Sequence, residues 1–274
     1  MPILFVSHGS PMTALEPREA GAFFQQLGQV LDSGWGRPRA VLAISAHSLA
    51  RRPTVLAASR HEAVHDFGGF PPELYTLRYD VAGAPALAHH IAQGSQDRIQ
   101  SHPSGGLDHG IWTPLRYIYP QADVPVVPLA FNPGDSPARQ FELGRLLSGL
   151  SHDGVLILAS GSITHNLGRV FKAPAPAIDA PEAPESAAFR RWFEQKAAAA
   201  DWAALLDYRQ QAPSAQDMHP TDEHLLPWYV AAGAGGSDDP ALRLHASLTY
   251  GALGMDAYAF GPSATALRKA LLAV

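Results

Sequence analysis

Three of the thirteen histidines in this 274-residue chain stand where a β-sheet could bring them together. His8, His47 and His165 each lie at or just beyond the end of a short apolar run that is typical of a buried strand. Because ligands bind at the carboxyl ends of the strands in an open α/β sheet, we expect the three imidazoles to share one site. Neutral imidazole is a ligand for Zn, Fe and Cu, and the chain has no cysteine. The pattern therefore predicts a catalytic metal site with an open coordination position.

A further ligand for this metal is expected from residues 221–227. This segment offers a carboxylate, Glu223, and an imidazole, His224. Successive residues of a helix point about 100° apart, so one of the two side chains is expected to face the metal. The residues alone leave the choice between them open.

The remaining histidines have plainer interpretations. His61 and His65 are four residues apart, but the glycine-rich segment 67–69 interrupts any helix there, so we interpret His61 as a surface residue. His245 alternates with leucines in a predicted strand and is expected to project to the opposite face. His219, which precedes a proline, stays undecided. Four more histidines are expected to be solvated, namely His89, His90, His102 and His152.

The composition excludes several classes of function. The 20 basic and 25 acidic residues give a formal charge of -5 with no long run of either sign, so no nucleic-acid partner is expected. The lack of cysteine excludes disulfides, iron–sulfur clusters and a cysteine nucleophile. Because no apolar run approaches the roughly 20 residues that span a bilayer, we expect no membrane segment and a cytoplasmic protein.

Short apolar runs alternate with amphipathic stretches along the chain. The apolar runs are predicted strands, and their lack of polar positions indicates that helices cover both faces of the sheet. Strands are predicted at residues 3–6, 40–45, 54–58, 124–131 and 155–159, and helices at residues 18–31, 84–93, 113–118 and 137–150. This order predicts an α/β fold with a mostly parallel central sheet flanked by helices.

The amino-acid composition of the sequence changes after Phe171. An Ala- and Pro-rich connector occupies residues 172–177 and precedes helical sequence, which we interpret as an insertion at about residues 183–211. A strand at residues 242–249, a short strand near Tyr258 and a helix at residues 263–272 follow. Because no long-period repeat is present, residues 1–274 are predicted to form a single domain with its active site at the carboxyl ends of the strands.

Six motifs occur in an order that matches a known family. They are His8-Gly9-Ser10-Pro11-Met12, Ser45-Ala46-His47, His65-Asp66-Phe67-Gly68-Gly69-Phe70-Pro71, Leu107-Asp108-His109-Gly110, Ala159-Ser160-Gly161-Ser162-Ile163-Thr164-His165-Asn166-Leu167 and Glu223-His224-Leu225-Leu226-Pro227. On these motifs the chain resembles the class III extradiol ring-cleavage dioxygenases of the LigB type, most closely the DOPA 4,5-extradiol dioxygenase branch. The resemblance extends from the first residue to about residue 230.

The resemblance implies a ligand set for the metal. His8 and His47 would be ligands, with His224 as the third ligand in this branch. The wider class uses two histidines and a carboxylate, so Glu223 is a rival for the third place. His165 would lie beside the metal, as the catalytic base or as a further ligand when substrate is absent.

The resemblance also implies roles around the substrate. His109 would be a second acid/base group, and His65 with Asp66 would border the pocket for the ring. Asp108 would orient a neighbouring imidazole, a task that metal sites usually require.

The implied reaction suits these residue types. A catechol can chelate Fe(II) through both oxygens and leave a neighbouring position for O2. One hydroxyl must lose its proton, and a histidine such as His165 titrates near neutral pH and can accept it. The expected reaction inserts O2 into a DOPA-like ring and gives a ring-opened semialdehyde. Fe(II) is expected for activity, and Zn(II) can occupy the same site.

Two other functions stay open on the sequence. A zinc-dependent hydrolase also needs histidines and an open coordination position. A non-catalytic binding protein of the Memo type would share the fold without the chemistry. A serine hydrolase is not expected, because no Gly-x-Ser-x-Gly motif follows a strand. The identity of the catechol, the position of cleavage, the metal in cells and the oligomeric state are open.

Overall fold

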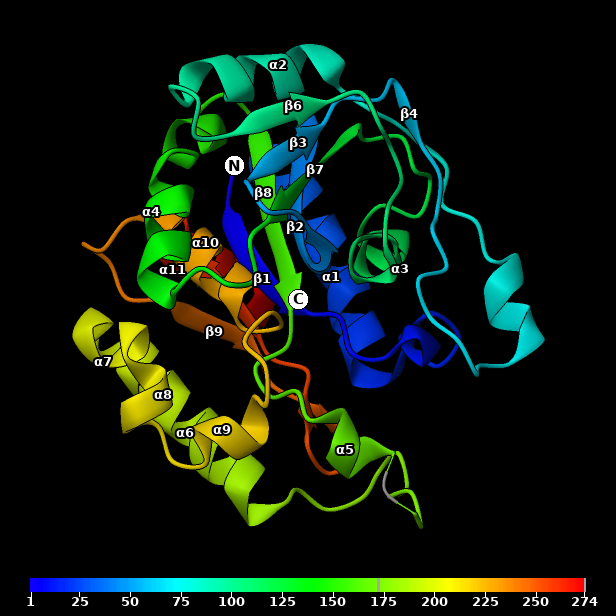
Figure 1. Cartoon of the computed structure of the whole chain (residues 1–274), viewed down its shortest axis with the longest axis vertical. Helices are drawn as coiled ribbons and strands as arrows, with labels where there is room; N and C mark the ends of the chain where they lie inside the picture. The colour runs from blue at the N-terminus through cyan, green and yellow to red at the C-terminus, as the bar shows by residue number, and fades with distance from the viewer. Residues whose placement is uncertain (172, 274) are drawn as a thin grey trace.

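Eight strands form the central sheet of the computed structural model, which describes residues 1–171 and 173–273 (Figure 1). The strands are β1 (Ile3–Ser7), β2 (Ala40–Leu49), β3 (Thr54–Leu56), β6 (Gln100–His102), β7 (Val126–Phe131), β8 (Val155–Gly161), β9 (Leu242–His245) and β12 (Ala257–Phe260). Their order across the sheet is β6-β3-β7-β2-β8-β1-β12-β9. Neighbours are parallel from β7 to β1. On one side of these strands β12 pairs antiparallel with β1 and β9 pairs antiparallel with β12, and on the other side β3 pairs antiparallel with β7. The prediction of an α/β fold with a mostly parallel sheet is confirmed.

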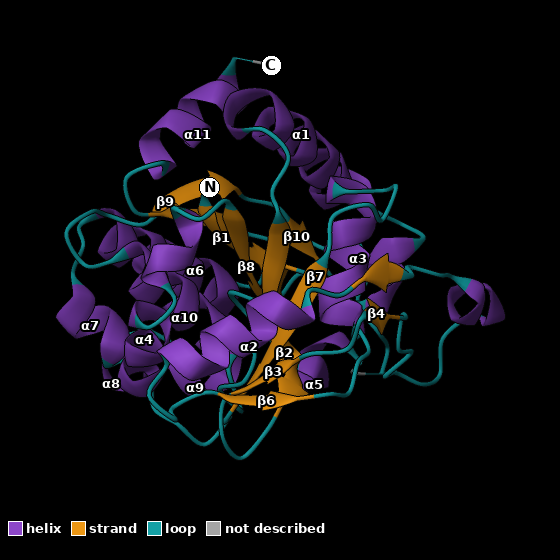
Figure 2. Ribbon diagram, turned by 90° about the horizontal axis from the view of Figure 1, so that it is seen from above, coloured by secondary structure: helices purple, strands orange, loops and turns teal. Residues whose placement is uncertain are grey.

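Helices cover both faces of this sheet (Figure 2). One face packs against α1 (Arg18–Trp35), α3 (His109–Ile118) and α11 (Ala264–Leu272), and the other against α2 (Pro85–Gly94), α4 (Pro137–Arg145), α6 (Pro184–Ala198) and α10 (Leu226–Gly235). Alternate residues of each strand supply the two cores. In β1, Ile3 and Phe5 face the α10 side, whereas Leu4 and Val6 face the α1 side. The strands are therefore apolar at successive positions.

Shorter elements complete the described chain. They are the 3-10 helices η1 (Pro11–Ala14), η2 (Pro72–Thr76) and η3 (Ser148–Ser151), the helices α5 (Leu167–Val170), α7 (Trp202–Leu206), α8 (Tyr208–Gln211) and α9 (Ala215–Met218), and the strand pairs β4 (Arg60–His61) with β5 (Val81–Ala82) and β10 (Leu248–Thr249) with β11 (Leu253–Gly254). The helices α6, α7 and α8 occupy the predicted insertion. Lys172, the first residue of the predicted connector, lies outside the described residues. Within the described ranges, no helix is long and apolar enough to cross a membrane.

The helix α10 is missed by the sequence patterns. All residues from 226 to 234 are buried, so the helix has no polar face and its sequence shows no helical period. It packs closely on α4. A Cβ added at Gly144 would lie only 2.0 Å from the carbonyl oxygen of Val230, and one added at Gly233 would lie only 1.9 Å from the carbonyl oxygen of Phe141. These glycines let the two helices approach, which holds the turn before α10 against the sheet.

The strand predicted at residues 242–249 is divided in two. β9 joins the central sheet, whereas β10 pairs with β11. A register shift between β9 and β12 disturbs the alternation of side chains, and His245 stacks on Phe23 of α1 with ring centroids 4.7 Å apart. The prediction that His245 projects to the opposite face from the leucines is therefore wrong, since Leu244 packs on the same core as Phe23.

Candidate metal centre

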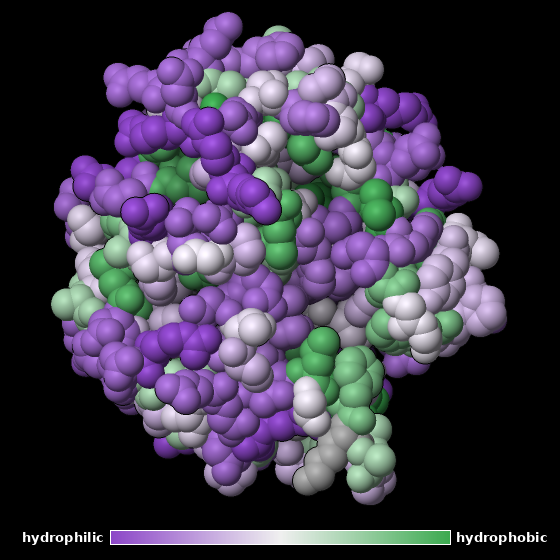
Figure 3. Space-filling model, viewed as in Figure 1, coloured by the Kyte–Doolittle hydropathy of each residue, from purple (hydrophilic) through white to green (hydrophobic). Residues whose placement is uncertain are grey.

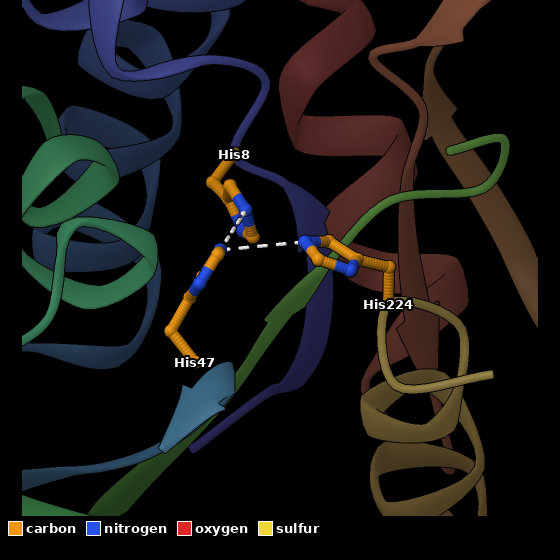
Figure 4. Close-up of side chains that lie close together, drawn as sticks. All are labelled: His8, His47 and His224. Atoms are coloured by element: carbon orange, nitrogen blue, oxygen red, sulfur yellow. Dashed lines mark hydrogen bonds between the residues drawn. The ribbon is translucent and has the colours of Figure 1, made fainter. Parts of the chain in front are cut away.

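Three imidazoles converge at the carboxyl ends of the central strands (Figure 4). His8 follows β1, His47 lies near the end of β2, and His224 lies in the turn before α10. The Nε2 atom of His47 is 3.3 Å from that of His8 and 3.3 Å from that of His224. The three ligand atoms all lie within 4.8 Å of one another. The structure thus brings together the three histidines that the resemblance implies as ligands.

The spacing of these nitrogens fits a bound transition metal. Two imidazole nitrogens that each lie about 2.0–2.1 Å from a tetrahedral ion are about 3.3 Å apart, because the angle at the ion is about 109°. The separations measured from His47 Nε2 match this value. Whether each Nε2 carries a free lone pair depends on the hydrogen-bond partner of Nδ1 in the same ring.

In His8, the Nδ1 atom faces the hydroxyl of Ser160 at 3.0 Å. This hydroxyl donates its own hydrogen to the carbonyl oxygen of Gly110. It therefore accepts from His8, which places the ring hydrogen on Nδ1 and leaves the lone pair of Nε2 for a metal. Ser160 is missed from the sequence, although a hydroxyl near the end of an apolar strand is a signal for such a role.

In His224, the partner of Nδ1 is the neighbouring carboxylate. Oε1 of Glu223 lies 3.2 Å from this nitrogen and also accepts from Oγ1 of Thr221 at 2.8 Å. The two candidate residues lie in a turn before α10 rather than on a helix, so the expected helical separation of 100° does not apply to them. The geometry suits His224 as a ligand and Glu223 as the group that orients it.

In His47, Nδ1 lies 3.4 Å from Oδ2 of the Asp66 carboxylate, a charged contact rather than a hydrogen bond. Asp66 accepts hydrogen bonds from the backbone N–H of His109 at 2.9 Å and from Nδ1 of the same residue at 3.0 Å. Burial alone would raise the pKa of Asp66, but the hydrogen bonds from His109 outweigh this effect and lower it. One ionised carboxylate thus orients a candidate metal ligand and a candidate acid/base group.

Burial keeps the candidate ligands neutral. It lowers the pKa of His47 to about 4 and the pKa values of His8 and His224 well below their usual range, and repulsion among the imidazoles adds to the effect. The side chains of His8 and His224 are only 1% and 5% exposed. Because neutral imidazole is the form that binds a metal, protons compete weakly for this site near neutral pH.

Two further histidines lie against this group. The ring of His165 stacks on that of His224, with centroids 3.4 Å apart and planes 7° apart. Burial lowers the pKa of His165 to about 3, so its ring is an uncharged base at neutral pH. His109, the first residue of α3, places its ring centroid 4.1 Å from that of His47. Both histidines line the cavity that adjoins the three candidate ligands.

This cavity has a volume of about 270 Å³. Its volume lies just below the roughly 300–1,000 Å³ of sites for drug-sized ligands, so it suits a compound with a single ring. Asp66 lines the cavity, whereas His65 does not. Nε2 of His65 donates to the carbonyl oxygen of Leu77 at 3.1 Å, and its ring packs on that of Phe67. His65 therefore supports a residue of the wall rather than bordering the cavity itself.

Asp108 acts on the site differently from the sequence prediction. Its carboxylate accepts hydrogen bonds from the hydroxyl groups of Ser45 and Ser48, at 2.6 and 2.5 Å, rather than from an imidazole. The two serines flank His47 on β2, and the Ser45 hydroxyl also accepts from the backbone N–H of His47 at 3.2 Å. Asp108 thus fixes the position of the end of β2, which carries His47.

The histidines outside the site divide into two groups. His61, predicted at the surface, is instead fully buried, and its Nδ1 atom accepts from the backbone N–H of Gly106 at 3.1 Å. A loop from elsewhere in the chain covers it, which the local sequence cannot reveal. His219 is also buried, and its Nε2 atom donates to the carbonyl oxygen of Ile163 at 2.8 Å. The four histidines predicted to be solvated are exposed.

Comparisons with known proteins point to one family. A sequence model of the family described as "Catalytic LigB subunit of aromatic ring-opening dioxygenase" matches residues 2–261. The chain is 34% identical over 261 residues to "4,5-DOPA dioxygenase extradiol" of Beta vulgaris, a match that covers 93% of this chain and 95% of the relative. It is 33% identical over 263 residues to a protein of the same name from Escherichia coli strain K12, which covers 93% of each chain.

A solved structure has the same fold. The crystal structure of an uncharacterized protein from Escherichia coli K12 matches with a TM-score of 0.76 at 29% sequence identity, covering 95% of this chain and 100% of that chain. The family match includes every segment that carries a histidine of the candidate site. The chain therefore belongs to the LigB family of class III extradiol ring-cleavage dioxygenases.

Proposed function

We propose that this chain opens a catechol ring at an extradiol position with O2, using Fe(II) held by His8, His47 and His224. The observation that carries the proposal is the convergence of three Nε2 atoms beside a small cavity that two further histidines line. Family membership supports it, since the relatives are named for extradiol dioxygenation of DOPA. A ferrous ion bound there would supply the redox couple through which a catecholate and O2 react.

His165 suits the role of the base that takes a proton from the catechol. Its ring is uncharged at neutral pH, since burial lowers its pKa to about 3. A catecholate anion beside the ring would favour its protonated form, because opposite charges attract. His165 can therefore accept the hydroxyl proton as the substrate enters. Its stacking on His224 keeps it beside the candidate ligands.

His109 suits a second acid/base role. Its Nδ1 atom donates to Asp66, which leaves Nε2 as the nitrogen that can exchange a proton with the substrate. The carboxylate of Asp66 holds the ring of His109 in this orientation. The product would be a ring-opened semialdehyde, and the names of the relatives suggest a DOPA-like catechol as the first substrate to test.

Metal exchange tests this proposal. By the usual divalent order, an imidazole site binds Zn(II) more tightly than Fe(II), so the purified protein can carry zinc. Zinc has no accessible redox couple, so the zinc form should bind catechols without consuming O2. After anaerobic stripping and reloading with Fe(II), an oxygen electrode should record O2 uptake in equal amount to the ring-opened product.

The His165→Ala variant tests whether His165 is the catalytic base. It should retain metal and bind catechol, yet its kcat/KM should fall at least ~10²-fold, because general-base catalysis is typically worth that much. Near-normal turnover would move the role of base to His109 or to solvent. An iron form that is inactive on every catechol, together with hydrolysis of an ester or amide by the zinc form, would instead establish a zinc hydrolase.

A further inference from the structure

Gly161, the last residue of β8, lies between the backbones of two candidate metal ligands. Its carbonyl oxygen accepts from the backbone N–H of His8 at 3.1 Å. On its other side, a Cβ added at Gly161 would lie only 2.1 Å from the carbonyl oxygen of His224. The next residue, Ser162, donates its backbone N–H to that same carbonyl oxygen at 2.8 Å. The turn that carries His224 can therefore approach β8 this closely because residue 161 has no side chain.

Gly110, in the first turn of α3, lies between His8 and the residue that supports His47. A Cβ added at Gly110 would lie 3.1 Å from Nδ1 of His8 and 2.4 Å from Oγ of Ser45. The Ser45 hydroxyl accepts from the backbone N–H of His47 at 3.2 Å, so its displacement would release that group. The carbonyl oxygen of Gly110 also accepts from Ser160, the partner of His8 Nδ1. Gly110 therefore contacts groups that orient two candidate ligands.

An added methyl group would displace the neighbours of either glycine. Hydrophilic side chains predominate on the face that Figure 3 shows, but both glycines are buried beneath the surface, so the methyl group could not turn toward solvent. At Gly161 the contact with the carbonyl oxygen would have to lengthen from 2.1 Å to at least 3.0 Å. Metal ligands must be held within about 0.5 Å of their productive positions. The displacement at Gly161 exceeds that tolerance.

We propose that Gly161 and Gly110 are positioning residues of the candidate metal centre, which set the distances among His8, His47 and His224 because they have no side chain. The inference rests on the proposed function, since it takes the three histidines to bind the metal. The glycines themselves would not contact the ion. They act through the backbones of two ligands and through the hydroxyl groups beside them. An alanine at either position should therefore weaken metal binding although every ligand is still present.

The Gly161→Ala variant tests the contact with the turn before α10. We expect its affinity for Zn(II) to fall by about 10- to 100-fold, the usual effect of losing a group that orients a ligand. Competition with a chelator measures this affinity. The visible absorption of the Co(II)-loaded protein should also change, because its bands depend on the number and arrangement of the ligands. Neither measurement depends on turnover of a catechol.

Gly28→Ala is the matched control. A Cβ added at Gly28, in α1, would lie 2.2 Å from the carbonyl oxygen of Ile118, so its clash with backbone resembles that at Gly161. Ile118 is the last residue of α3, at the end remote from His109. Both variants should unfold at lower urea concentration than the unmodified protein, because overpacking destabilises a core. Only Gly161→Ala should lose metal affinity and show an altered Co(II) spectrum.

Gly110→Ala is the second variant. The atoms nearest to its added methyl group belong to side chains, which shift more easily than backbone, so this variant should fold even where Gly161→Ala does not. We expect its Zn(II) affinity to fall by about 10-fold, with an altered Co(II) spectrum.

Failure of this inference is distinct from failure of the proposed function. Unchanged metal affinity and an unchanged Co(II) spectrum in either folded variant, Gly161→Ala or Gly110→Ala, would overturn the inference for that glycine. An equal loss of affinity in Gly28→Ala would show a general effect of packing and overturn it for both. In these cases the proposed function stands. An unmodified protein that binds neither Zn(II) nor Co(II) would overturn both proposals.

Discussion

Three oxygen acceptors decide which nitrogen of each candidate ligand is free to bind a metal. Ser160, Asp66 and Glu223 lie next to the Nδ1 atoms of the three histidines. The hydrogen-bond partners of His8 and His224 and the negative charge beside His47 each favour the tautomer with hydrogen on Nδ1, so the Nε2 lone pairs face one another. The acceptors come from separate segments of the chain. The candidate metal centre therefore depends on residues that would not themselves contact a bound metal.

The third ligand can be identified with two variants. We expect His224→Ala to lose the metal and Glu223→Gln to keep it with weaker affinity. The first change removes a ligand, whereas the glutamine still offers an amide oxygen to Nδ1 of His224. Mass spectrometry of the folded proteins measures their metal content. Stoichiometric metal in His224→Ala, with loss from Glu223→Gln, would make the carboxylate the third ligand.

Asp66 should matter for the metal as well as for the cavity. Asp66→Asn is expected to weaken metal affinity by about 10- to 100-fold, the usual effect of losing a group that orients a ligand. The amide offers a single acceptor oxygen where the carboxylate serves both His47 and His109. Competition with a chelator measures the affinity. Glu73→Gln, which changes an exposed residue of η2, is the matched control. Equal metal affinities in the two variants would show that Asp66 lines the cavity without contributing to metal binding.

The helix α6 is tied to the sheet by a buried ion pair. Arg190 donates to the carboxylate of Asp256 through Nε at 2.8 Å and through Nη2 at 3.1 Å. Asp256 is fully buried just before β12, and its backbone carbonyl accepts from the N–H of Ser7 at 3.0 Å. The ion pair thus links α6 to the end of β1, after which His8 follows.

Breaking this ion pair should destabilise the protein. Removal of one partner from a buried pair costs about 3–5 kcal/mol, because the other charge is left without compensation. Arg243 contacts the same carboxylate at 3.3 Å, so we expect Arg190→Ala to lower the free energy of unfolding by the lower part of this range. Chemical denaturation measures the change. The neighbouring Arg191→Ala is exposed and should have little effect, and equal losses in the two variants would contradict the prediction.

The stability of the whole molecule should depend on pH through its buried histidines. Burial lowers the pKa of His219 from 6.5 to about 4. Between about pH 4 and pH 6.5, His219 is therefore protonated in the unfolded chain but not in the folded chain. Unfolding takes up protons in this pH range. By linkage, the contribution of His219 to stability is complete above about pH 6.5 and is lost as the pH falls toward about 4.

A single substitution isolates this contribution. His219→Gln can still donate to the carbonyl oxygen of Ile163, but its amide does not titrate. The variant should therefore lose less stability than the unmodified protein between about pH 7 and about pH 4.5. Urea denaturation at both pH values, with equal metal content, measures the two losses. Parallel losses would show that His219 has the same pKa in the folded and unfolded chains.

The sheet could be predicted from the sequence because its strands are buried on both faces. Runs such as Ile3–Ser7 and Val155–Gly161 are apolar at nearly every position, a pattern that parallel strands under two helical layers require. Burial on all sides also makes α10 hard to predict, because a helix that is apolar on every face shows no hydrophobic periodicity in its sequence. A strand or helix is thus predictable from the sequence where its hydrophobic pattern is compatible with only one type of element.

The sequence predicts that the candidate histidines lie at one edge of the sheet, but it does not predict the hydrogen bonds among the residues around them. The placement of His8, His47 and His165 after strands follows from topology, because parallel strands end at one edge. The partner of His8 is Ser160, 152 residues away, and the two meet because β8 lies beside β1. A hydrogen bond between distant residues depends on strand order and register, which local patterns do not encode. For the same reason the position of each ring proton, and with it the direction of each lone pair, follows from the folded chain.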